Sequence, residues 1–338
     1  MSLRRVLDIV GPLCLASVRP FKDGGVIITE HVLDLEQTRR HVEVLGRWFD
    51  FIHLSDLPNR LRARSKKPFC LLTFDDGKRS NATVVAPELK RLGVAAAFFV
   101  VTSSLGSNTP FWFDRYWALR RKLRTVPAGF DLHALKKLPY SVLTARIEQA
   151  CAQHGVEVDL RNDDVRPMSW DEARRLHLQG FSVGAHGHTH AILTRETRAD
   201  ALENIARSIA KVRDEIGASR PAFAFPNGNY TPDLALHAMH CGAGAVLTTE
   251  PTWLDHTFPL WRLPRVQLFS GHGPGVIQCK LALAATGRIL SNPDGTGRSY
   301  RAMRKFRNPA PGNSESLHEP AAADPGRNQN KPRCDRNE

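Results

Sequence analysis

Two adjacent carboxylates, Asp75 and Asp76, follow an apolar run and precede a glycine in "FCLLTFDDG". Neighbouring carboxylates repel each other unless a cation or strong hydrogen-bond donors stabilise both charges. A second polar cluster lies in "AHGHTH", where His186 and His190 are four positions apart and His188 falls between them. Two imidazoles and one carboxylate are typical ligands of a divalent ion such as zinc. The sequence therefore indicates a metal site in which one of the two aspartates is the third ligand.

Each pattern alone has an ordinary structural explanation. Asp-Asp-Gly after a strand often forms a turn or caps a helix. Three histidines in alternation can also belong to a solvated loop. Because both patterns fall at predicted strand ends within one α/β core, the metal site is the better interpretation.

The elements that must position these residues alternate regularly from residue 69 onward. Strands are predicted at 69–74, 94–101, 181–186, 221–226 and 244–249, and helices at 81–93, 169–180 and 196–217. This alternation predicts parallel strands joined by right-handed crossovers, hence an α/β barrel or a doubly wound sheet. Both architectures place active sites past the carboxyl ends of the strands, where the polar motifs lie.

Composition favours one large core with appendages. The chain has 338 residues, of which 42% are apolar and 24% charged, enough to bury a single α/β domain. We expect an N-terminal extension at 1–65, with an amphipathic helix near 34–49, that packs on a catalytic domain at 66–290. Residues 291–338 are basic and poor in large apolar side chains, so we expect a largely disordered tail.

Three motifs carry a family resemblance. "TFDDG" (73–77), "AHGHTH" (185–190) and "FAFPNGNY" (223–230) resemble the polysaccharide deacetylase family, also called carbohydrate esterase family 4 or the NodB-homology domain, in a form similar to its FAYPYG subgroup. The resemblance spans about residues 66 to 270. It implies a distorted (β/α) barrel that removes acetyl groups from N- or O-acetylated sugars with a divalent metal, for which we expect zinc.

The resemblance also implies roles for individual residues. Asp75 matches the general base, and Asp76, His186 and His190 match the metal ligands. The backbone N–H of Asn227 matches the donor that holds the oxyanion, a role that suits preorganised main-chain groups.

Two aromatic or proline-containing segments are candidate substrate contacts. Pro226 stands beside Asn227 in "FPNG", and Trp112 belongs to the aromatic-rich stretch "PFWFDRYWALRR" (110–121). For Trp112, packing in a helix core is the main expectation and stacking on a sugar the alternative.

Two positions within these motifs depart from the family pattern. Gly187 stands where Ser or Thr is usual, so a hydrogen bond that braces the loop is expected to be missing. Ala224 replaces the arginine that orients the base. Arg265 in "WRLPR" is the candidate to supply that cation, with a surface arginine as the alternative.

No histidine matches the family's general acid cleanly. His272 in "FSGHGPG" is the nearest candidate, and an exposed loop histidine is the alternative. His188 or a metal-bound water would come next.

We therefore expect a hydrolase that removes acetyl groups from an N-acetylhexosamine-containing glycan, acting on a lipid-linked or nascent bacterial exopolysaccharide. A degenerate member that binds metal without efficient turnover is the alternative within the family. The net charge of +13 also makes a nucleic-acid-binding protein an alternative from a different functional class. Its basic residues are spread throughout without a recognisable module, so no nucleic acid is expected as partner.

The sequence predicts a cytoplasmic protein that can be peripheral to the inner membrane. It has no run of about 18 apolar residues, no convincing signal peptide, and six scattered cysteines typical of a reducing compartment. The tail stretch "RSYRAMRKFR" (298–307) carries five basic residues and could dock on anionic lipids. A solvated tail is the alternative.

Overall fold

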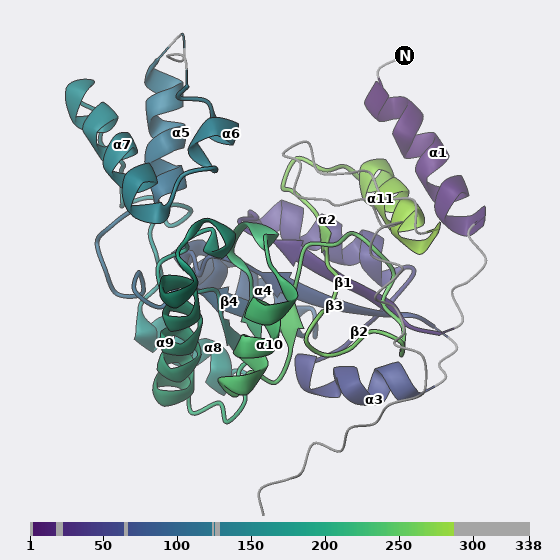
Figure 1. Ribbon diagram of the computed structural model, residues 1–338. Coiled ribbons are helices and arrows are strands. Elements are labelled where there is room, and N and C mark those ends of the chain that lie inside the picture. Colours follow the sequence, from purple (N-terminus) through teal and green to yellow (C-terminus); the bar gives the residue numbers. More distant parts are fainter. Residues whose placement is uncertain (1–2, 18–22, 64–66, 124, 126–128, 287–338) are drawn as a thin grey trace, which may run out of the picture.

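The computed structural model describes residues 3–17, 23–63, 67–123, 125 and 129–286. At its centre is a curled sheet of eight described strands in the order β7-β6-β5-β4-β3-β1-β8, with β2 paired to β3 beside that path (Figure 1). All seven strand pairs are parallel. The strands are β1 (Gly25–Glu30), β2 (Asp50–Phe51), β3 (Phe69–Phe74), β4 (Ala96–Val100), β5 (Ser182–Ala185), β6 (Phe223–Ala224), β7 (Val246–Leu247) and β8 (Val266–Gln267). The expected distorted (β/α) barrel is confirmed.

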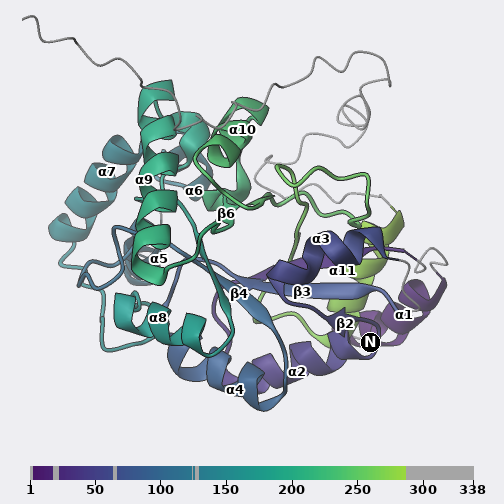
Figure 2. The ribbon, with the colours of Figure 1, turned by 90° about the horizontal axis from the view of Figure 1, so that it is seen from below.

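Helices follow the strands and surround them, as Figure 2 shows for α2, α4, α8, α9 and α10. The helices are α1 (Leu3–Ser17), α2 (Leu35–Gly46), α3 (Leu57–Arg62), α4 (Ala86–Arg91), α5 (Trp112–Lys122), α6 (Leu132–Leu135), α7 (Tyr140–Gln153), α8 (Trp170–Leu178), α9 (Arg198–Ile216), α10 (Pro232–His240) and α11 (Pro274–Thr286). A π-helical turn, Asn81–Val85, precedes α4. The predicted limits of α8 and α9 are confirmed: Ser169 and Glu172 form a capping box, and Gly217 ends α9 at φ 76°.

Side chains alternate between the two faces of the sheet, as the strand period requires. Ile27, Leu71 and Phe99 belong to a core cluster of their own. Their neighbours along the strands belong to the larger cluster that the helices cover. The barrel interior is therefore a packed core, and chemistry is left to the strand ends.

An irregular segment closes the barrel. Leu263 forms a parallel bridge with Leu247 of β7, while Val266 in β8 pairs with Ile28 of β1. The segment thus spans the two edges of the sheet, and Arg265 lies at the seam between them.

The domain boundary expected at residue 65 separates strands that belong to one continuous sheet. β1 is buried along its whole length and pairs with β3 from Gly25–Phe69 to Glu30–Phe74. The first 65 residues therefore supply a central strand as well as a covering helix. In Figure 1, α1 lies alongside α11, and the two pack so closely that a Cβ added at Gly11 would lie 2.7 Å from Cα of Gly275.

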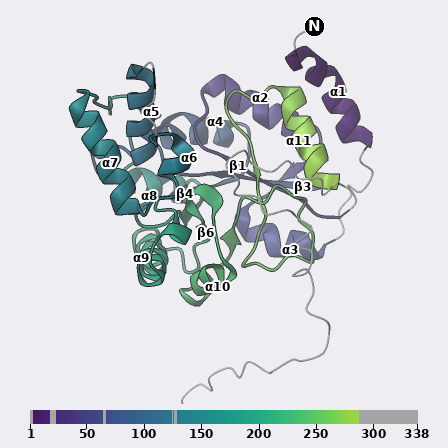
Figure 3. The same ribbon diagram turned by 45° about the horizontal axis from the view of Figure 1, so that its top comes forward.

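Helices α5, α6 and α7 form a helical insertion between β4 and α8 (Figure 3). They share a small core of their own, made of Trp112, Tyr116, Leu119, Leu135, Leu143, Ile147 and Cys151. The expected disordered tail, 291–338, and its basic stretch 298–307 lie outside the described residues. Within the described part of the chain, every helix is too short or too polar to span a bilayer.

Candidate active site

Asp75 is held by a buried arginine. Asp75 follows β3 directly, and its two carboxylate oxygens accept hydrogen bonds of 2.7 and 2.8 Å from the two terminal nitrogens of Arg265. Arg265 has no solvent exposure, and its Nε donates to the carbonyl of Thr248 at 3.0 Å. The Thr29 hydroxyl donates to the same carboxylate at 3.2 Å. This bidentate geometry keeps the carboxylate ionised and oriented.

Asp76, His186 and His190 converge beside it. One ligand atom from each lies within 4.8 Å of the others, and all three residues are buried. Oδ1 of Asp76 is 3.6 Å from Nε2 of His186 and 3.1 Å from Nε2 of His190. That oxygen makes no aligned hydrogen bond within the described part of the chain. A buried carboxylate oxygen facing two imidazole nitrogens fits a divalent ion with open positions for water and substrate.

The charge state of the three groups suits such an ion. Burial raises the pKa of Asp76, but His190 and His186 outweigh that effect and hold it below the ordinary value. Burial lowers the pKa of His186 to about 4, so this imidazole is neutral at pH 7. Its Nδ1 faces the carbonyl of Ala224 at 2.9 Å, which directs Nε2 toward the site. Neutral imidazole and ionised carboxylate are the metal-binding forms.

The turns that carry the ligands use unusual backbone conformations. Asp76 has φ 74° and His190 has φ 55°, both in the left-handed region. Gly77 follows at φ 70°, and a Cβ there would lie 3.0 Å from the side chain of Val100. Non-glycine residues in this region cost free energy and persist where the surrounding structure holds them, which is common at functional sites.

The missing Ser or Thr at position 187 has a structural explanation. Gly187 has φ 75°, and an added Cβ would lie 3.1 Å from both Pro226 and Asn204. Asn204, on α9, braces the loop instead, because its Oδ1 accepts from the backbone N–H of His188 at 2.7 Å and its Nδ2 donates to Thr189 at 2.9 Å. The brace therefore comes from a neighbouring helix.

The third histidine of the motif lies apart from the metal ligands. Nδ1 of His188 pairs with the Thr102 hydroxyl at 2.9 Å. Burial lowers its pKa, and so do Arg207 and Lys211 on α9. His188 therefore faces α9 and is poorly suited to donate a proton at the site.

His31, which the sequence analysis overlooked, lies beside both aspartates. It follows β1 directly, and the register that pairs Glu30 with Phe74 places it next to Asp75. The N–H of Asp75 donates to the Glu30 carbonyl at 3.0 Å. Arg265 lowers the pKa of Asp75 most and His190 that of Asp76, and an electrostatic interaction with His31 adds to both effects. The signal was present in "GVIITEH", an apolar run that a histidine follows at the strand end, just as Asp75 follows β3.

His272 is less suited to donate a proton. It lies past β8, where its Nδ1 accepts a hydrogen bond from the backbone N–H of Phe269 at 3.2 Å. Burial, Lys280 and His41 lower its pKa to about 4. An imidazole with that pKa is neutral at pH 7, which makes His272 a poor proton donor.

The expected substrate contacts divide into two groups. Asn227 lies in a tight turn, Pro226–Gly228, with φ 57°, and Pro226 faces Gly187 at the edge of the metal-ligand loop. Trp112 is only 5% exposed, and its indole N–H donates to the carbonyl of His190 at 3.4 Å. The main expectation for Trp112, packing in a helix core, is confirmed. The alternative, contact with substrate by sugar stacking, does not fit, because protein atoms enclose its ring.

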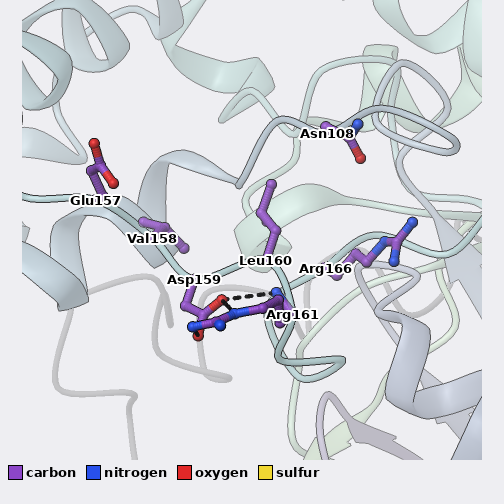
Figure 4. A pocket seen from close by; sticks show the side chains of 7 residues that line it. All are labelled: Asn108, Glu157, Val158, Asp159, Leu160, Arg161 and Arg166. Atoms are coloured by element: carbon purple, nitrogen blue, oxygen red, sulfur yellow. Dashed lines mark hydrogen bonds and ion pairs between the residues drawn. The ribbon is translucent and has the colours of Figure 1, made fainter.

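A separate hollow of about 430 Å³ lies away from this centre (Figure 4). It is lined by Asn108, Glu157, Val158, Asp159, Leu160, Arg161 and Arg166. Arg161 is paired within it to Asp159. Its lining includes neither Asp75 nor a metal ligand, so the hollow is distinct from the candidate active site.

The fold and the site together define the class of protein. A curled parallel barrel with aspartates and histidines at the carboxyl ends of its strands is the architecture of a barrel enzyme. The model of the polysaccharide deacetylase family matches residues 62–246, more than half of the chain. The chain belongs to this family. A search of curated proteins returned no match.

Solved structures with the same fold include several deacetylases. The chain is similar to the Streptococcus pyogenes deacetylase PplD in complex with acetate, with a TM-score of 0.53, 14% identity, and 77% of this chain and 99% of that chain covered. IcaB from Ammonifex degensii gives a TM-score of 0.51 and 18% identity over 77% and 97% of the two chains. A de-N-acetylase from Aggregatibacter actinomycetemcomitans gives 0.52 and 14% over 77% and 100%. At these identities the similarity shows the shared fold.

Proposed function

We propose that the protein is a metal-dependent hydrolase that removes the N-acetyl group from an N-acetylhexosamine in a glycan. The observation that carries the proposal is the buried Asp75–Arg265 pair beside the convergent side chains of Asp76, His186 and His190. Family membership supports an acetylated carbohydrate as the substrate. The names of two solved relatives, a deacetylase with acetate and a de-N-acetylase, support the same reaction.

Amide hydrolysis needs an activated carbonyl, a base and an acid. A divalent ion held by Asp76, His186 and His190 would polarise the acetyl carbonyl and make water more acidic. Zinc suits this ligand set of two imidazoles and one carboxylate.

Asp75 takes the proton from the attacking water in this scheme. The carboxylate is available as a base because Arg265 and His186 outweigh the effect of burial and lower its pKa. Arg265 also fixes the orientation of the carboxylate, since both terminal nitrogens are engaged. The backbone N–H at Asn227 is the proposed donor to the oxyanion.

His31 is the proposed general acid. It lies past the strand next to that of Asp75, and it is only partly buried. The departing amine needs a proton, which a histidine can deliver near neutral pH. This role replaces the one expected of His272, whose pKa of about 4 leaves it neutral at pH 7.

Acetate release from N-acetylglucosamine oligosaccharides tests the proposal. We expect release by the purified chain with zinc, loss of release after chelation, and recovery when zinc is restored. The control is Asp75→Asn, which should keep the metal and lose turnover. Release that is insensitive to chelation, or that is equal for Asp75→Asn, would refute the proposal.

The cellular substrate is proposed to be a lipid-linked or nascent exopolysaccharide met on the cytoplasmic side of a membrane. The support is the composition of the chain: a net charge of +13 and a basic stretch at 298–307, which favour contact with anionic lipid. Co-sedimentation with anionic and neutral vesicles tests this, and equal binding to both would contradict it.

A further inference from the structure

Lys78, two residues beyond Asp76, is buried close to the metal ligands. It is only 2% exposed. Its ammonium forms an ion pair with Asp114 in the first turn of α5 and donates to the carbonyl of Val165 at 3.0 Å. It also lies over the ring of Phe111, 4.2 Å from the centroid. Because a buried ammonium is costly unless paired, these partners hold the turn and the insertion together.

The same part of α5 encloses His190. The ring of Phe113 lies 5.0 Å from the His190 ring, centroid to centroid, at 63°. Trp112 donates to the His190 carbonyl. Nδ1 of His190 is buried without a hydrogen-bond partner in the described part of the chain, whereas Nδ1 of His186 faces the carbonyl of Ala224.

This difference matters because a metal-binding imidazole is usually oriented by a hydrogen bond to its second nitrogen. His190 has no such bond among the described residues. Its ring is instead oriented by the aromatic side chains around it. Those side chains are adjacent in sequence to Asp114, the partner of Lys78. The ion pair therefore connects the turn that carries Asp76 to the helix whose aromatic side chains enclose His190.

We propose that Lys78 and Asp114 form an ionic latch that fixes His190 relative to Asp76 and thereby sets the affinity of the centre for a divalent ion. The latch rests on the proposed function, since it requires Asp76 and His190 to share that ion. Lys78 and Asp114 are positioning residues, because they act through the segments that carry the ligands. In this proposal the helical insertion helps to position a metal ligand, His190.

Binding of Co²⁺ to the full-length chain tests the latch, because the visible absorption of Co²⁺ reports ligand geometry independently of turnover. Lys78→Met and Asp114→Asn should each raise the Co²⁺ dissociation constant by at least about tenfold and change the absorption band. The matched control is Glu88→Gln on α4, which removes the charge of a buried carboxylate that pairs with Arg39 and Arg91. Its affinity and spectrum should equal those of the wild type.

The outcomes separate the latch from the proposed function. Wild-type Co²⁺ affinity and spectrum in folded Lys78→Met or Asp114→Asn would overturn the latch and leave the metal site intact. If neither single variant folds, Lys78→Met/Asp114→Leu replaces the pair by apolar side chains, and wild-type affinity there would again overturn it. Failure of the wild-type chain to bind Co²⁺ would refute the metal site itself and the latch with it.

Discussion

Arg265 and Asp75 are joined by two parallel hydrogen bonds of 2.7 and 2.8 Å across the closure of the barrel. The arginine lies between the bridge to β7 and the pairing with β1, where the carbonyl of Thr248 fixes its Nε. The family pattern supplies this cation from the position occupied here by Ala224. A cation from another segment therefore reaches the same carboxylate.

Arg265→Met should move the acid limb of activity to higher pH. Burial raises the pKa of Asp75 and Arg265 lowers it, so removal of the arginine should raise this pKa. The base works only when deprotonated, so we expect the pH below which activity is lost to rise. Turnover at pH 7 should fall about 10²-fold or more. The measurement is kcat/KM against pH at matched metal content, and an unmoved acid limb would contradict the pairing's role.

His31→Gln should slow amide cleavage by about 10²- to 10⁴-fold without loss of metal, since the amine then departs without a proton donor. Ester cleavage should suffer less because an alkoxide leaves more easily. The comparison is His272→Ala, expected to change the rate by less than about threefold. Amide and ester turnover measured for both variants decide between the two histidines. A larger effect of His272→Ala would restore it as the acid.

The adjacent aspartates should separate in their phenotypes. Asp76→Asn and His186→Ala should lower zinc affinity by more than about tenfold, because each removes a ligand. Asp75→Asn should bind zinc and lose turnover. Zinc titration followed by acetate release measures both properties. Reversed behaviour of the two aspartate variants would mean that their roles are exchanged.

The metal-free protein should lose stability as the pH falls from about 6.5 to 4. Burial lowers the pKa of folded His186 from 6.5 to about 4, so the unfolded chain takes up the proton first. Its contribution is present above pH 6.5 and declines toward pH 4, by up to about 3 kcal/mol. Urea unfolding in a chelator at pH 7 and pH 4.5 measures this. Wild type should lose more stability than His186→Gln, and equal losses would exclude His186 as the cause.

Gly187→Ser should be harmful although the family often has serine there. The substitution forces φ 75° on a non-glycine residue and brings Cβ within 3.1 Å of Pro226 and Asn204. Gly217→Ser is the control, since it meets the same φ at the end of α9 with open space around its Cβ. We expect Gly217→Ser to cost about 1 kcal/mol and Gly187→Ser clearly more, by thermal or urea unfolding. Equal costs would show that the contacts are unimportant.

Sequence reasoning located the parts of the fold that have strong local signals. The strand at 69–74 and the capped helices α8 and α9 are confirmed, because apolar period and capping residues coincide there. β8 has two residues and is defined by its pairing with β1, so its local sequence has no pattern that predicts a strand. β1 does have an apolar pattern, but it lies in the expected N-terminal extension, and its place in the sheet depends on pairing with β3. His31 was overlooked for that reason.

The residues of the site also differ in how well the local sequence predicts them. The metal-ligand motifs and Asp75 could be read from adjacent residues, and the structure brings their side chains together. The burial of Arg265 depends on pairing across the barrel closure, which local sequence does not encode. The enclosure of Trp112 by the insertion depends likewise on tertiary packing.

The placement of β1 and β8 side by side has a practical consequence for dissecting the protein. The family match ends at residue 246 and begins at 62, so a fragment trimmed to it would retain Asp76, His186 and His190. That fragment would lack His31 and Arg265. It would also leave the hydrogen-bonding edge of β3 bare, and an uncovered strand edge recruits other chains. Trimming by similarity alone would therefore yield an aggregation-prone fragment. It would keep the metal ligands but lack both the arginine that orients Asp75 and the proposed general acid.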